Sequence, residues 1–414
     1  MKINPLAALS PLCLCLFAGT AWADIEPFTV GAGETLTHDS NVGRDDAHRI
    51  TDWYSTTELH GGVDQALGRD QLVGSAAVNY NDYFKHVDDD LDSFGYRGAL
   101  QLNWSTVGDL SGSLGADASR RRYDYGFEDA SGSDLGRNLE TDSHAFAKVS
   151  LGGVSRWNIF GGFDANRRRF SSAGYAVNDE QQWSQNLGTT YSTSPDLSFG
   201  ITGNYTRGEY PNYITSASNF DSKSISGTTK WQASGNSSFN ASLGYTTQNS
   251  DLQPTLRFVS GGLYWNWVPP SHFSVNLGLS RSTDGGAAAG ATVATLNDRS
   301  LNTTATLNVT YAMTAKISLV AGGQYVHRKY ADVTVPAVLS DGASDPNPND
   351  AIVVSGTSHS TRFSLAAHYQ PTRTTDLSCS ASHEVRSSGS AELVLLNPNY
   401  TDNLLMCAAS INFD

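Results

Sequence analysis

The chain has 414 residues and a formal net charge of −14, with only 27 lysines and arginines. This balance argues against nucleic acid as a partner, because backbone binding requires a basic surface. After the first 23 residues no run is apolar enough for a transmembrane helix. A low hydropathy is also expected of a membrane β-barrel, because half of each strand faces water.

The first 23 residues predict a secretory signal. Lys2 supplies a positive start, residues 6–18 an apolar stretch too short to span a bilayer, and residues 21–23 an Ala-Trp-Ala cleavage site. Cys13 and Cys15 lack the small preceding residues of a lipoprotein site, so no lipid anchor is expected. Residues 24–414 are expected to form one domain, an outer-membrane β-barrel.

From residue 28 onward one unit repeats: an alternating strand, a short turn, a second alternating strand and a longer polar loop. In residues 197–205, Leu197, Phe199 and Ile201 fall on one face and small polar residues on the other. Residues 239–245 and 273–279 repeat this pattern. The fold class expected is all-β, a transmembrane antiparallel up-and-down barrel with lipid outside and water inside.

Eighteen strands are expected, with an uncertainty of two, beginning near residues 28, 52, 72, 93, 110, 141, 156, 181, 197, 221, 238, 256, 272, 301, 316, 358, 376 and 403. Short turns rich in Gly, Pro, Asn, Ser and Asp join them in pairs on the periplasmic side, and longer loops lie outside the cell. Both termini are then periplasmic. The longest loop, residues 331–356, either stays outside or folds inward as a constriction.

The apolar face carries aromatic residues at both ends, as expected for side chains at the two membrane–water interfaces. The belt near the short turns comprises Trp104, Trp157, Tyr191, Trp231, Phe239, Trp267, Phe273, Tyr311, Tyr369 and Phe413. The belt toward the loops comprises Trp53, Tyr80, Phe94, Tyr96, Trp183, Tyr205, Tyr245 and Tyr325. A soluble all-β protein is the alternative, but two such belts disfavour it.

The polar face is expected to line an aqueous lumen. The candidate lumen-lining residues are Arg97, Arg121, Lys148, Arg156, Arg168, Lys230, Arg362, Asp117, Asp164 and Tyr83. One interpretation is a wetted wall braced by ion pairs. The other is an electropositive strip between Arg97 and Arg168 that contacts an anionic substrate. Lumen aromatic residues such as Tyr83 either stack on sugar rings or fill space near the rim.

The two cysteines of the mature chain predict the register of the last hairpin. Cys379 and Cys407 each share a face with the apolar residues of their strand, and a hairpin centred near Leu393 places them opposite each other. Opposed residues at a non-hydrogen-bonded pair are within disulfide reach, and the compartment is oxidising. The alternative is two free thiols that face lipid as small apolar residues.

Nothing in the sequence indicates catalysis, and neither a cofactor nor a metal is expected. There is no nucleophile elbow, no His/Cys cluster with metal-ligand spacing and no glycine-rich phosphate loop. Ser358-His359 and Ser382-His383 are only neighbours in sequence, and consecutive strand residues face opposite ways. Acidic runs in the loops are interpreted as solvated surface, with divalent cation binding as the alternative.

Four stretches resemble one family of barrels. They are Glu34-Thr-Leu-Thr-His-Asp-Ser-Asn-Val42, Leu91-Asp-Ser-Phe-Gly-Tyr96 leading to Leu102-Asn-Trp104, Gly208-Glu-Tyr-Pro-Asn212, and Val259 to Trp267 followed by Ser280-Arg-Ser-Thr-Asp-Gly285. In this order they resemble the EpsL family, which is encoded in exopolysaccharide-biosynthesis operons. The chain departs from the family pattern at His38 and Ser40 and at residues 281–284.

The resemblance implies an outer-membrane barrel tied to exopolysaccharide secretion. Its expected partners are outer-membrane lipid, the secreted polysaccharide, and periplasmic and inner-membrane export components. The leading hypothesis is therefore a passive, non-enzymatic conduit for polysaccharide. The alternatives are a general or sugar-selective uptake porin and a structural accessory of the secretion machinery. An exporter needs a wide, smooth lumen, whereas an uptake porin usually has an inward constriction loop.

Overall fold

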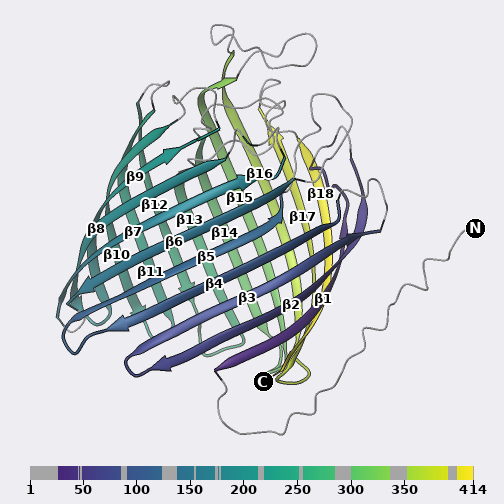
Figure 1. Ribbon diagram of the computed structural model, residues 1–414, viewed down its shortest axis with the longest axis horizontal. Helices are drawn as coiled ribbons and strands as arrows, with labels where there is room; N and C mark the ends of the chain where they lie inside the picture. Colours follow the sequence, from purple (N-terminus) through teal and green to yellow (C-terminus); the bar gives the residue numbers. More distant parts are fainter. Residues whose placement is uncertain are drawn as a thin grey trace, which may run out of the picture.

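The computed structural model describes residues 27–44, 46, 49–84, 91–123, 138–152, 155–172, 176, 179–212, 219–250, 255–284, 300–335, 352–389 and 399–413. These residues form one closed antiparallel barrel of eighteen strands, in which each strand pairs with its neighbours in sequence and β1 pairs with β18 (Figure 1). Among the described residues, no helix is long and apolar enough to cross a membrane. The protein is a bacterial outer-membrane β-barrel.

The strands run as β1 Phe28–Asp39, β2 Asp52–Leu67, β3 Asp70–Tyr83, β4 Ser93–Ser105, β5 Leu110–Arg122, β6 Leu139–Leu151, β7 Trp157–Phe170, β8 Glu180–Ser194, β9 Leu197–Glu209, β10 Phe220–Ser234, β11 Ser237–Ser250, β12 Leu256–Trp267, β13 Phe273–Asp284, β14 Ser300–Ala312, β15 Ile317–Val335, β16 Ile352–Tyr369, β17 Thr375–Ser388 and β18 Tyr400–Phe413. The expected number of strands is confirmed, and most predicted starts lie within two residues of the observed ones. Val30 pairs with Phe413, so β1 begins at the same end of the barrel where β18 stops.

The predicted extent of the longest loop, residues 331–356, is partly wrong, because the hairpin of β15 and β16 continues beyond the other strands. Residues 331–335 and 352–356 belong to these strands, after a register shift between Tyr330 and Val333. Val333, Thr334 and Val335 pair with residues 352–354, and such β-branched residues favour strands. The start of β16 was therefore predicted six residues too late. Residues 336–351 lie outside the described part of the chain.

The outer face is apolar and ends in aromatic residues, as predicted. Near the short turns, Trp157 lies 4.7 Å from Tyr191 and Phe273 lies 4.6 Å from Tyr311, measured between ring centroids. Toward the long loops, Trp183 lies 5.3 Å from Tyr205. These pairs sit on adjacent strands at opposite ends of the barrel, where amphipathic rings meet the two membrane surfaces.

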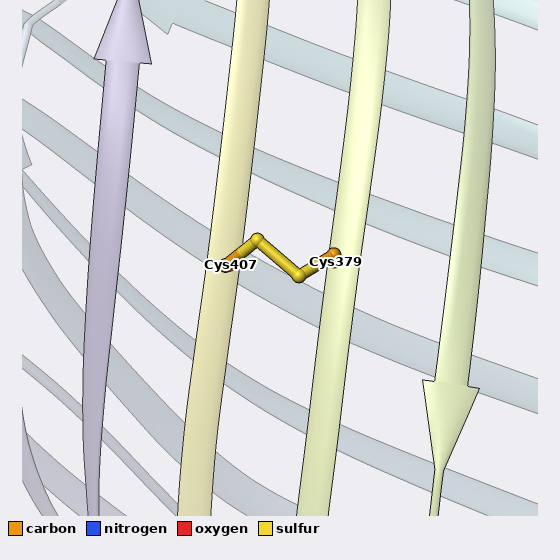
Figure 2. Close-up of a disulfide and its surroundings, with 2 residues drawn as sticks. All are labelled: Cys379 and Cys407. Carbon is orange, nitrogen blue, oxygen red and sulfur yellow. A yellow bond between two sulfur atoms is a disulfide. The ribbon is translucent and has the colours of Figure 1, made fainter.

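The cysteines meet across the last hairpin, as the alternation predicts. Cys379 of β17 lies directly opposite Cys407 of β18, with a Cα–Cα distance of 4.1 Å. A disulfide joins them across the two neighbouring strands (Figure 2). Leu377 and Leu405, on the same exposed face of these strands, place the disulfide on the lipid side of the wall. The free-thiol alternative does not describe this structure.

Candidate functional site: the lumen wall

Burial identifies which face of the barrel is inward. Asp52, Glu140, Glu180 and Asp402 are buried although they are charged, and by strand alternation all of them share the polar face. Side chains crowd together on the concave side of a closed sheet, whereas large apolar residues on the other face stay exposed. The polar face is therefore the lumen wall.

Arg97 makes the first ion pair of this wall. It extends from β4 across β3 to Glu58 of β2, and its two terminal nitrogens each donate to one carboxylate oxygen at 2.8 Å. The paired forks of guanidinium and carboxylate fix both side chains in one plane. His60, next on the same face of β2, lies 3.5 Å from the same carboxylate.

Arg121 and Arg168 share one buried carboxylate. Glu140 is 3% exposed and lies 3.0 Å from Arg121 and 2.9 Å from Arg168. Arg168 also lies 3.1 Å from Asp142. The register produces this cluster, because Arg121 lies opposite Glu140 across the β5–β6 pair and Asp142 lies opposite Arg168 across the β6–β7 pair.

His144 lies below this cluster, between two carboxylates. Its Nδ1 is 2.8 Å from Asp117, and its Nε2 is 3.4 Å from Asp164. Its ring stacks on Phe146 at 5.5 Å, and the Lys148 ammonium lies 4.8 Å from the centre of the Phe146 ring. The inward faces of β5, β6 and β7 thus form a continuous polar ladder.

A pocket of about 320 Å³ opens within this part of the wall. Its inward-facing lining residues are Asp117, Asp142, His144, Asn166, Arg168, Glu180 and Gln182. Three of these side chains carry a carboxylate and one a guanidinium. The pocket can therefore offer more acceptors than donors to a passing solute, which favours a cationic or hydroxyl-rich one.

A second charged cluster lies across the lumen wall, where β16, β17 and β18 reach the extracellular end. Arg362 lies 3.6 Å from Glu384, and Arg44 lies 3.7 Å from Glu384 and 3.1 Å from Asp402. Arg44 comes from the loop after β1, and its positive φ of 54° is the one such value among the described non-glycine residues. This loop residue braces the end of the wall that closes the barrel.

Two predicted lumen residues lie at the ends of the wall. Arg156 precedes β7 in a short turn and is exposed at the periplasmic rim, because the turn ends one residue later than predicted. Tyr83 is only 5% exposed and packs with Val42, Leu91 and Tyr54 at the extracellular end of the wall. Its ring fills space near the rim, which was one of the two roles expected for it.

The remaining predicted residues face the lumen in different settings. Lys230 lies between Ser198 and Asn240 without an ion pair to any carboxylate that the structure describes. Arg97, Arg121, Arg168 and Arg362 all have carboxylate partners. These pairs support the ion-pair interpretation over the electropositive strip. From β2 to β8 the inward carboxylates outnumber the inward lysines and arginines, so the wall is acidic rather than basic.

Several residues of the site were not among the predicted ones. Glu140, Asp142 and Glu180 hold or face the arginines, yet in sequence they only precede or begin strands. The sequence offered one signal, the alternation of strand residues. It places each carboxylate on the same face as its arginine partner once the strand pairing is known. Among the described residues no cluster of three His, Cys, Asp or Glu side chains is arranged to hold a metal ion.

Aromatic side chains of the lumen lie flat along the wall. A Cβ placed on Gly115 would come within 2.8 Å of the Phe146 ring, and one on Gly278 within 3.2 Å of the Tyr264 ring. Phe160 covers Gly188 in the same way. Glycine therefore leaves room on the neighbouring strand for each ring, and the rings follow the wall rather than cross the lumen. Tyr264 remains 50% exposed.

No family model matches the chain, and no curated protein matches it. Similar solved structures include the outer membrane protein opdK from Pseudomonas aeruginosa, with a TM-score of 0.47 and 10% identity over 93% of this chain and 99% of that one. OccAB3 from Acinetobacter baumannii gives a TM-score of 0.48 and 11% identity over the same shares of the two chains. The FrpB iron transporter from Neisseria meningitidis gives 0.46 and 12% over 87% and 62%.

Proposed function

We propose that the protein is a passive outer-membrane channel for small polar solutes and that it favours cationic over anionic ones. The observation that carries the proposal is the continuous polar face inside a closed eighteen-stranded barrel. A barrel of this size encloses more space than its own inward side chains fill, so water and solutes have a path through it.

The preference for cations follows from the charges of the lumen wall. Arg97, Arg121 and Arg168 are held by carboxylates, so their charge is largely compensated where a solute passes. Asp117 and Asp164 face the imidazole of His144 rather than a lysine or an arginine. Rings of acidic side chains select for cations in channels.

Recordings from purified protein in planar bilayers test this function. With different KCl concentrations on the two sides, the reversal potential should have the sign of a cation-preferring channel. The double variant D117N/D164N should reduce the preference, whereas the control D221N should not, because Asp221 lies on the outer face. Absence of conductance, or a preference for anions, would contradict the proposal.

Export of an exopolysaccharide is the second candidate, and the flat aromatic residues favour it. Phe146, Phe160 and Tyr264 present ring faces along the wall without narrowing the lumen, as a path for a chain of sugars requires. The other support for export is the resemblance of the sequence motifs to the EpsL family. The export hypothesis also predicts contacts with periplasmic export components.

The two candidates differ in what a deletion changes. If small solutes are the cargo, deletion of the gene should slow their uptake and leave surface polysaccharide intact. If polysaccharide is the cargo, deletion should abolish or strongly reduce it, and Y264A should reduce it in part. Unchanged polysaccharide together with slower solute uptake would rule out export.

A further inference from the structure

The outer face carries a group of arginines above a groove, and this region does not belong to the lumen wall. Arg120 of β5 and Arg169 of β7 both lie opposite Thr141 of β6, and Arg167 lies opposite Ser143 one pair lower. Two strand spacings separate Arg120 from Arg169, about 10 Å. The three guanidinium groups therefore surround two small residues on one patch of the wall.

Within the part of the chain that the structure describes, these arginines have no acidic partner of the kind found in the lumen. Among the described residues, no carboxylate lies within 4 Å of Arg120, Arg167 or Arg169. Asp179 has an electrostatic interaction with Arg169. Its carboxylate, however, already accepts one hydrogen bond at 2.8 Å from the Phe170 backbone and another at 2.8 Å from Asn212. Three long cations on a lipid-facing wall thus lack the compensation that burial in a membrane would require.

The position of the three arginines along the barrel axis explains how they can face lipid without acidic partners. Tyr96, an aromatic residue of the belt near the extracellular end, lies opposite Arg120, and Trp183 of the same belt lies one pair below Arg167. The arginines are therefore level with or just above the belt, where lipid head groups begin. No outward-facing lysine or arginine occupies the periplasmic half of the described strands.

Directly below the arginines lies a groove of about 960 Å³ in the outer face. Its floor consists of small residues on four adjacent strands: Gly98, Ala116, Ala118, Ser143, Ala145 and Ala165. Leu100, Phe163 and Trp183 form its walls and Arg167 its upper end. A Cβ on Gly98 would meet no atom closer than 3.8 Å, so the groove is open in front of this glycine.

The geometry points to a binding site for a phosphorylated lipid of the outer leaflet. One acyl chain lies in the groove between Leu100 and Trp183, and Arg120, Arg167 and Arg169 bind a phosphate of the head group. Apolar walls match the chain, and three uncompensated guanidiniums match a phosphate, which they can bind in a bidentate manner. No bond is made or broken.

A second groove on the outer face provides an internal comparison. It measures about 600 Å³ and lies between Phe363, Leu365 and Leu405, with Ala381 on its floor. Histidines 38 and 383 stand at its upper end instead of arginines, and His383 lies 2.8 Å from Asn403. This groove can hold an acyl chain, but no arginines stand above it to bind a phosphate. It should therefore not select a phosphorylated lipid.

The test uses the full-length protein, folded in neutral detergent, and two probes: hexa-acylated lipid A with its phosphates, and the same lipid after dephosphorylation. Bound lipid is counted by native mass spectrometry. R120Q/R167Q/R169Q should weaken binding of the phosphorylated probe about 100-fold, from the usual contribution of each basic residue near an anionic surface. K223Q/R257Q/R281Q removes the same charge from the extracellular half of the same face and should change binding little.

Two further variants test the groove itself. A145W fills the floor below the arginines and should prevent binding, whereas A381W fills the second groove and should leave binding intact. Equal loss in both triple variants would indicate diffuse attraction to the surface and overturn the site. Equal binding of both probes would overturn the role of the arginines, and binding by A145W would overturn that of the groove. Mobility on gels before and after boiling shows that each variant is folded.

Discussion

Two short runs of arginine show how differently one side chain behaves on the two faces of this barrel. In residues 120–122 and 167–169, the central Arg121 and Arg168 point inward and share the buried Glu140. Their neighbours Arg120, Arg167 and Arg169 point outward, and no carboxylate among the described residues lies within 4 Å of them. Alternation separates these two groups, because adjacent strand residues face opposite sides. Arg122, the last residue of β5, belongs to neither group, since its guanidinium lies 4.9 Å from the centre of the Tyr83 ring. The inner arginines brace the wall, and the outer ones are available to a ligand from the membrane.

The largest expected effect is on stability, and it separates a buried ion pair from an exposed one. Glu140→Gln leaves Arg121 and Arg168 without their shared carboxylate and should lower the free energy of unfolding by about 2 kcal/mol, less than for a fully buried pair because the arginines are 68% and 40% exposed. Glu209→Gln breaks the exposed pair with Arg207 and should cost less than about 0.5 kcal/mol. Urea unfolding of both variants in the same detergent measures the difference. Equal costs would mean that the Glu140 cluster does not brace the wall.

Ion selectivity is expected to respond only to the inner arginines. The triple variant R97Q/R121Q/R168Q leaves Glu58, Glu140 and Asp142 without counter-charges, so the cation-to-anion permeability ratio should rise several-fold. The outer variant R120Q/R167Q/R169Q removes the same number of charges and should leave the ratio unchanged. Reversal potentials in planar bilayers compare the two. A shift in the outer variant would place those arginines in the solute path.

The strand pattern, the number of strands and the cysteine pairing were predictable because each depends on alternation or on a symmetric hairpin. The partners of Arg121 and Arg168 were not. The pairing of Arg121 with Glu140 spans the long connection between β5 and β6, and a loop of that length does not determine which residues lie opposite each other. For this reason the sequence left two interpretations open, a wall braced by ion pairs and an electropositive strip: the cations could be counted, but their carboxylates could not be assigned to them.

The groove was not predictable for a related reason. Gly98, Ala118 and Ser143 are unremarkable on their own strands, and they form a floor only because β4, β5 and β6 place them in one row. The extension of β15 and β16 likewise depends on pairing beyond the region where lipid imposes an apolar face. Alternation therefore predicts which face a residue occupies, and register decides what it meets there.

Single variants at the neighbouring positions 167 and 168 test whether lipid binding belongs to the outer face and ion selectivity to the inner face. Arg167→Gln should weaken binding of phosphorylated lipid A about fivefold, the effect expected for one basic residue, and leave the reversal potential unchanged. Arg168→Gln should leave lipid binding unchanged and shift the reversal potential toward cations, because Glu140 and Asp142 lose a partner. If both variants changed both properties, the wall would respond as a whole and the division between faces would fail.

The smallest effect is expected from Asp179, the loop carboxylate that influences Arg169. Asp179→Asn keeps an oxygen that accepts from the Phe170 backbone and removes the negative charge, so lipid A should bind about twofold more tightly. Because burial raises the pKa of the Asp179 carboxyl, the comparison is made at about pH 8, far above the ordinary pKa of a carboxyl group. Asp221→Asn is the matched control. The Asp221 carboxylate accepts a hydrogen bond from the hydroxyl of Tyr205, a residue two strands away from Arg167, and it has no contact with the three arginines. Weaker binding in Asp179→Asn would mean that this carboxylate positions Arg169 rather than competing with the lipid phosphate for it.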